Sequence, residues 1–269
     1  MIITRNMMEY VPIDYATAII PKITGTISFS SSIFVLQDIL RNPRKRTSTY
    51  HLILSALSCC DILSSFVFMM GTWIMEKDSQ LFAGGTNATC AVFGFINQFA
   101  NLGSVLYVAT LSIYYLMILK LRWPDRKIKK VQVLLLGGPA FFSLAFAIAG
   151  AALHIYGSAN WLCWISSANK EYWLWFMYIP VWSSVAFILI TMILIYRGVR
   201  ELETKASKYA FSPSGLRKNT KKRVKSNRVM RQAFFYVGAL LITWLWGSIL
   251  RMHDLIYQEV LNPVLILMT

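Results

Sequence analysis

The sequence predicts an all-α membrane protein, a bundle of seven membrane-spanning helices in which the seventh helix is truncated. The first reason is composition, because 56 % of the 269 residues are hydrophobic, 14 % are charged and the mean hydropathy is +0.51. A soluble core does not need so much apolar sequence. The second reason is a series of apolar segments long enough to cross a hydrocarbon layer of ~30 Å as helices. The third is that the cations behind the formal charge of +15 lie in short clusters between these segments, which argues against a nucleic-acid-binding domain.

Six apolar segments are each long enough to cross a bilayer, and a seventh begins near the end of the sequence. The expected spans are about 18–40, 52–75, 90–119, 131–156, 173–196 and 230–250. Residues 255–269 are too short to cross alone, so we interpret them as an incomplete seventh helix that completes the bundle of residues 18–269. Residues 1–17 mix charged and apolar side chains. They are expected to form an extracellular tail rather than a cleaved signal peptide.

Positive charge alternates from one connection to the next. The connections after the first, third and fifth spans are rich in Lys and Arg, whereas the connections after the second and fourth spans contain only Lys77 and Lys170. Because cytoplasmic loops retain positive charge, the N-terminus is expected outside, in a multi-pass protein of the plasma membrane. The longest basic connection, 197–230, then becomes a cytoplasmic loop. The cations expected to face a cytoplasmic partner are Arg44, Lys45, Arg126, Lys127, Lys221, Lys222 and Arg223.

Two features of the expected outer side agree with this orientation. Asn87-Ala88-Thr89 matches the glycosylation sequon, although a lone sequon is often fortuitous. Cys90 and Cys163 both lie on the outer side, where an oxidising environment allows a disulfide that ties the loop over the bundle; free thiols are the alternative. Cys59 and Cys60 lie within the second span and are interpreted as small packing residues.

A polar face is expected at the middle of the membrane. Asp61 lies about halfway along the second span, where an ionised carboxylate is costly unless it is paired or hydrated. Asn97, Asn101 and Ser104 recur at helical spacing in the third span and reach the same depth. One interpretation is a hydrated, cation-binding network that repacks when the protein switches. The other is interhelical hydrogen bonding that holds the bundle together.

The outer half of the bundle contains candidate ligand-binding or switch residues. Pro139 and Pro180 each free a backbone carbonyl and bend their helices, which can open a cavity. Arg251 either meets an anionic ligand or extends to the head groups, and the second interpretation is favoured. Most tryptophans near the outer boundary are interpreted as an interfacial belt. The candidate ligand or switch residues are Trp164, Trp244, Trp246 and Arg251.

Several motifs resemble the slime-mould cyclic-AMP receptors, the class E seven-helix receptors. The matching segments are residues 57–63 around Asp61, Cys90 with 97–99, 161–165, 178–182 and Thr243-Trp244-Leu245-Trp246-Gly247-Ser248-Ile249-Leu250-Arg251. The resemblance implies an agonist site open to the outside, an extracellular small-molecule ligand and coupling to a heterotrimeric G protein within membrane lipids. Ile113-Tyr114-Tyr115 stands where rhodopsin-like receptors have Asp-Arg-Tyr. This departure predicts that the chain lies outside the rhodopsin class.

Other functions are less consistent with the sequence. A transporter of a small solute is the main alternative, because polar residues at the midplane also coordinate solutes or ions, but no duplicated halves are visible. A retinal-binding pump needs a lysine at mid-membrane, and no complete span has one. His51, His154 and His253 share no ligand spacing, so neither an enzyme nor a metal site is expected. No cofactor and no nucleic-acid partner is expected.

Overall fold

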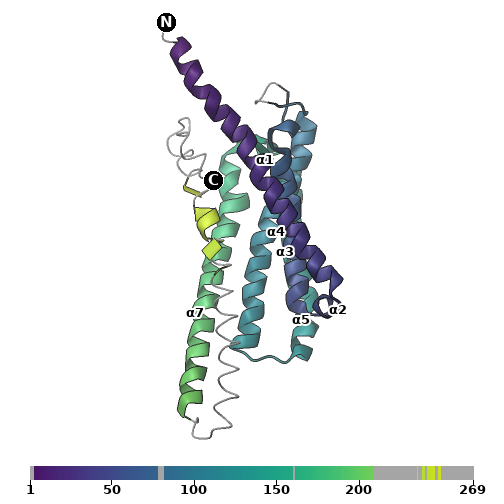
Figure 1. The fold of residues 1–269 in the computed structure, drawn as a ribbon, viewed down its shortest axis with the longest axis vertical. Coiled ribbons are helices and arrows are strands. Elements are labelled where there is room, and N and C mark those ends of the chain that lie inside the picture. The colour runs from purple at the N-terminus through teal and green to yellow at the C-terminus, as the bar shows by residue number, and fades with distance from the viewer. Residues whose placement is uncertain are drawn as a thin grey trace.

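The computed structural model describes residues 3–77, 82–159 and 161–208, and beyond these 235, 238–239, 241–245 and 248–249. Five long helices run through this part of the chain (Figure 1). They are α1 (Ile3–Arg41), α3 (Thr49–Met70), α4 (Asn87–Leu119), α5 (Asp125–Ala152) and α7 (Ile179–Lys208).

Five helical segments of the described residues are long and apolar enough to cross a membrane, and they overlap the first five expected spans. They are Ala18–Arg41, Thr49–Ile74, Asn87–Leu119, Asp125–Ala152 and Glu171–Glu201. Residues 3–17, expected as a tail, continue α1 beyond its apolar span. The sixth expected span, 230–250, is described only in part. The expected seventh helix, 255–269, and residues 209–230 of the basic loop lie outside the described residues.

Short elements connect the long helices. Asn42 caps α2 by accepting a hydrogen bond from the backbone N–H of Arg44, as its short polar side chain favours. The structure departs from regular α-helix just before Pro180, where a π-helical turn precedes α7. The short helices are α2 (Pro43–Arg46), the 3₁₀ helices η1 (Gly71–Ile74) and η2 (Ser167–Asn169), α6 (Glu171–Trp173) and the π-helix η3 (Leu174–Tyr178).

Helix α4 packs against α3, α5 and α7, while α1 packs on α3. Glycine permits the closest approaches. A Cβ at Gly25 of α1 would lie 2.7 Å from the backbone N of Met69, and one at Gly103 of α4 would lie 2.9 Å from Cys60 Sγ. Cys60 is buried, as expected for a packing residue. Large apolar side chains such as Phe34 remain exposed on the outer faces of the helices, which suits contact with lipid.

A β-hairpin connects α5 to α6. Strands β1 (Tyr156–Ala159) and β2 (Leu162–Ile165) pair antiparallel, with Ser158 opposite Cys163. All four residues of β2 are buried. The predicted disulfide is confirmed, since Cys163 is bonded to Cys90 at the start of α4 with a Cα–Cα distance of 5.1 Å. The hairpin is therefore fixed to one end of the bundle, the disulfide end.

Candidate functional site: a polar line along α4

A hydrogen-bonded network joins α3 to α4 at the middle of their length. Ser104 Oγ on α4 donates to Asp61 Oδ1 on α3 at 2.7 Å. One turn away, Ser64 Oγ donates to Asn101 Oδ1 at 3.1 Å, and Asn101 Nδ2 donates to Asn97 Oδ1 at 2.6 Å. The structure therefore brings together the four predicted residues and adds Ser64. Ser64 lies three residues after Asp61 on the same helix face, and this spacing is the sequence signal that predicts its place beside Asp61.

Asp61 keeps capacity for a further partner. A carboxylate accepts about four hydrogen bonds, and Asp61 has the Ser104 hydroxyl as its hydrogen-bond donor in the described part of the chain. No Lys, Arg or His lies within salt-bridge distance of Asp61 among the described residues, where the one ion pair joins Lys45 to Asp38. A half-buried carboxylate with a single neutral donor has acceptor capacity for a cation or a further donor.

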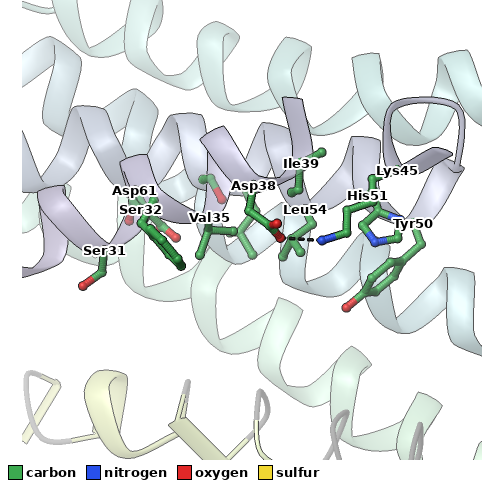
Figure 2. Close-up of a pocket in the computed structure, with 13 residues that line it drawn as sticks. Ser31, Ser32, Val35, Asp38, Ile39, Lys45, Tyr50, His51, Leu54 and Asp61 are labelled. Atoms are coloured by element: carbon green, nitrogen blue, oxygen red, sulfur yellow. Dashed lines mark hydrogen bonds and ion pairs between the residues drawn. The ribbon is translucent and has the colours of Figure 1, made fainter. Parts of the chain in front are cut away.

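A cavity of about 540 Å³ lies between α1 and α3 (Figure 2). Asp61 lines one end of it. The other end is formed by the ion pair between Lys45 Nζ and Asp38 Oδ2 and by the aromatic rings of Tyr50 and His51. The cavity thus joins the mid-membrane network to the end of the bundle that carries α2.

His51 is the unsatisfied group of this cavity. Its Nδ1 is buried and has no hydrogen-bond partner among the described residues. The imidazole lies edge-on to Tyr50, with ring centroids 4.9 Å apart. An unpaired buried nitrogen costs about 1–3 kcal/mol, so this end of the cavity is less well satisfied than the network around Asp61. No three His, Cys, Asp or Glu side chains of the described ranges gather in a metal-binding arrangement.

A second polar group, Gln98, lies at the disulfide end and was not predicted as a site residue. Its side chain is 0 % exposed. Trp164 Nε1 of the hairpin donates to Gln98 Oε1 at 2.7 Å, and Gln98 Nε2 donates to the carbonyl of Phe176 at 2.8 Å. Pro180 follows Phe176 by four residues and has no N–H for that carbonyl. Gln98 therefore joins the hairpin to the bend before α7.

Trp164 belongs to the core of this end. Its ring stacks on Trp173 with an interplanar angle of 16° and a centroid distance of 6.1 Å. Trp173 is 0 % exposed and donates from Nε1 to the carbonyl of Ile165. Trp173 is thus not part of an interfacial belt, and Trp164, a candidate ligand or switch residue, is buried beside it. Trp175, by contrast, is exposed, as a belt residue should be.

Other predicted residues fall into three groups. Trp244 packs against the same buried cluster as Trp164. Asn87 is the first residue of α4, and Thr89 of its sequon forms a capping box with Thr86. Trp246, Arg251, Lys221, Lys222 and Arg223 lie outside the described residues.

The predicted cations that are described share one end of the bundle. Arg44 and Lys45 are on α2, and Arg126 and Lys127 are on the first turn of α5. The beginnings of α3 and α5 meet there, since Thr49 Oγ1 donates to Gln132 Oε1 at 2.9 Å. This basic end is the one opposite the hairpin and its disulfide.

These features define a helical membrane bundle with a disulfide-tied hairpin at one end and a basic surface at the other. Residues 31–266 match the family described as 7 transmembrane receptor (rhodopsin family), and the chain belongs to this family. Its fold is similar to the crystal structure of squid rhodopsin, with a TM-score of 0.75 and 15 % sequence identity over 96 % of this chain and 74 % of that chain. Comparison with curated proteins gives no match.

The family match corrects one prediction. The absence of Asp-Arg-Tyr predicted a chain outside the rhodopsin class, and this is wrong, because the match extends over residues 31–266 and does not depend on one triplet. Tyr115 of the substituted triplet is buried in the core. The chain is an integral, multi-pass G-protein-coupled receptor, and no feature favours the transporter alternative.

Proposed function

We propose that this receptor carries an extracellular small-molecule signal to a heterotrimeric G protein. One observation carries the proposal: α4 bears polar side chains that bond the hairpin at Gln98 and α3 at Asn101 and Ser104, from the disulfide end to the middle of the bundle. Gln98 contacts the hairpin, its neighbour Asn97 bonds Asn101, and Ser104 one turn further bonds Asp61 beside the cavity. Movement of the hairpin therefore acts on the helix whose Ser104 bonds Asp61, the carboxylate that lines the cavity.

The orientation follows the charge and the disulfide. The basic end faces the cytoplasm, because cytoplasmic loops retain cations. The Cys90–Cys163 disulfide lies at the opposite end and faces the oxidising exterior of the plasma membrane. Asn87, at the first turn of α4, is the glycosylation candidate on the same side.

The ligand acts at the hairpin end. Trp164 and Trp244 pack on one apolar cluster that reaches α4 and α7, so a ligand that displaces either ring alters the contacts between helices. Differential contacts of this kind are what shift a two-state bundle. Trp246 and Arg251 are assigned to the same function on the sequence pattern alone. The finer assignment, a cyclic-AMP-receptor-like ligand specificity, rests on the motif at 243–251.

The Asp61 network is the switch at mid-membrane. It binds a cation or water in one state and repacks in the other, since Asp61 has one neutral donor and adjoins the cavity. On the basic end, the acidic surface of a G protein meets cations of the receptor. The candidates are Arg44, Lys45, Arg126, Lys127, Lys221, Lys222 and Arg223.

Guanine-nucleotide exchange tests the proposal. Membranes carrying the receptor are mixed with a panel of purified G-protein heterotrimers and screened with cyclic nucleotides and other small molecules. Ligand-dependent exchange on at least one heterotrimer is expected, and Trp164→Ala should shift the ligand concentration needed. The absence of both ligand-dependent and basal exchange across the panel would overturn the proposal.

A further inference from the structure

The start of α5 presents unpaired positive charge. Its first two turns contain one carboxylate, Asp125, and one buried residue, Ile128. The surrounding cations are all exposed, and none forms an ion pair within the described part of the chain. They are Arg122, Arg126, Lys127, Lys129 and Lys130.

Two of these cations begin the most lipid-exposed stripe of the helix. Arg126 and Lys130 are four residues apart and therefore one above the other on α5. Steps of three and then four residues continue the same helix face through Val133, Gly137 and Phe141. Val133 and Phe141 are 81 % and 75 % exposed, the highest values among the large hydrophobic side chains of the described residues. The positive patch of Arg126 and Lys130 therefore adjoins the exposed apolar surface of Val133 and Phe141 on the same face of α5.

The stripe also has a shallow notch. A Cβ at Gly137 would meet nothing within 4 Å, so the surface is recessed between the side chains of Val133 and Phe141. An acyl chain that lies over this recess touches apolar groups on both sides. Its headgroup is then placed beside Lys130 and Arg126, one and two turns away along the same face.

We propose that this face of α5 is a binding site for a multiply phosphorylated inositol phospholipid of the cytoplasmic leaflet. Its phosphates contact Arg126 and Lys130, flanked by Arg122 and Lys129, and an acyl chain follows Val133 to the Gly137 notch. Five exposed cations against one carboxylate match a multivalent headgroup better than a singly charged one. The site rests on the proposed orientation of the basic end and not on G-protein coupling.

Lipid binding to the purified full-length receptor tests this site. Receptor is placed in nanodiscs of phosphatidylcholine containing either phosphatidylinositol bisphosphate or phosphatidylserine at equal total charge, and bound lipid is counted by native mass spectrometry. Selective retention of the bisphosphate lipid is expected. Arg126→Gln combined with Lys130→Gln should weaken it about thirtyfold, since each cation near the surface contributes about a fivefold effect. Equal retention of both lipids would overturn the proposal.

Matched variants separate a defined site from general electrostatics. Arg44→Gln with Arg46→Gln removes the same charge from the connection that carries α2 and should leave retention unchanged. Gly137→Leu fills the notch from a position where a Cβ meets nothing within 4 Å, so lipid retention should fall while thermal unfolding of the receptor stays unchanged. An equal loss of lipid retention in the Arg44/Arg46 control would show that positive charge alone attracts the lipid, and would contradict a defined site. Unchanged lipid retention in Gly137→Leu would contradict the site as well.

Discussion

The two ends of the bundle differ in how fully their buried polar groups are hydrogen-bonded. At the hairpin end, Gln98, Trp164 and Trp173 are buried or nearly so, and the side-chain polar groups of all three have hydrogen-bond partners. At the basic end, the Lys45–Asp38 ion pair is partly exposed and His51 Nδ1 is buried without a partner beside a cavity. Hydrogen bonds therefore stabilise a single arrangement of the hairpin end. At the basic end, the present arrangement of polar groups contributes little to stability.

This difference fits the direction of signalling. A satisfied, neutral network transmits a displacement because breaking any of its bonds leaves a buried group unpaired. An unsatisfied group next to a cavity permits a second packing at small cost. In this scheme the hairpin end responds to the ligand, and the helices rearrange at the basic end. Each experiment below breaks one of these two arrangements, beginning with the largest expected effect.

Removal of the disulfide should affect the hairpin end most. Cys163→Ser opens a covalent loop with a sequence separation of 73 residues, which corresponds to about 4 kcal/mol of stability. Thermal unfolding of detergent-solubilised receptor and surface expression measure the effect. Cys59→Ser, at an exposed cysteine, is the matched control and should unfold like the unmodified receptor. Equal unfolding of the two variants would show that noncovalent contacts alone hold the hairpin.

Loss of Gln98 should have the next largest effect. Gln98→Leu leaves the buried Trp164 Nε1 without its acceptor and removes the side-chain donor to the Phe176 carbonyl, at a cost of about 3 kcal/mol. Adding Trp164→Phe removes one of the stranded groups and should recover part of the loss in a double-mutant cycle of thermal unfolding. Strictly additive losses would contradict the bridge between the hairpin and α7.

The parts of the site that follow from periodicity could be predicted from the sequence. Depth and helical spacing predict that Asp61, Asn97, Asn101 and Ser104 lie together. Hydrogen bonds join them in two pairs, Ser104 with Asp61 and Asn101 with Asn97. The disulfide followed from the alternation of basic loops, which put both cysteines on one side.

The other parts of the site depend on tertiary contacts, which the sequence pattern does not show. The strands of the hairpin are four residues each, too short for a clear alternating pattern. Gln98 binds a backbone carbonyl and a hairpin side chain, so neither partner has a fixed spacing from it in sequence. No local pattern in the sequence shows that β2 places all four of its residues, Trp164 among them, in the core.

The mid-membrane network should show a smaller effect on stability and a larger one on signalling. Asp61→Asn keeps an acceptor for Ser104 Oγ while it removes the charge, so surface expression should be retained and nucleotide exchange altered. Ser104→Ala removes one hydrogen bond and should cost about 1 kcal/mol in thermal unfolding. A collapse of surface expression in Asp61→Asn would assign the residue to structure rather than switching.

Replacement of His51 should have the smallest effect on stability, and it should raise stability where the other substitutions lower it. His51→Phe keeps an aromatic ring against Tyr50 and removes the unpaired Nδ1, so stability should rise by up to about 1 kcal/mol. The same kind of change at the hairpin end, Trp173→Phe, removes a satisfied N–H donor and should lower stability. Thermal unfolding of the two variants side by side measures both signs. A loss of stability in both would mean that the basic end is as fully satisfied as the hairpin end, and the contrast between them would fail.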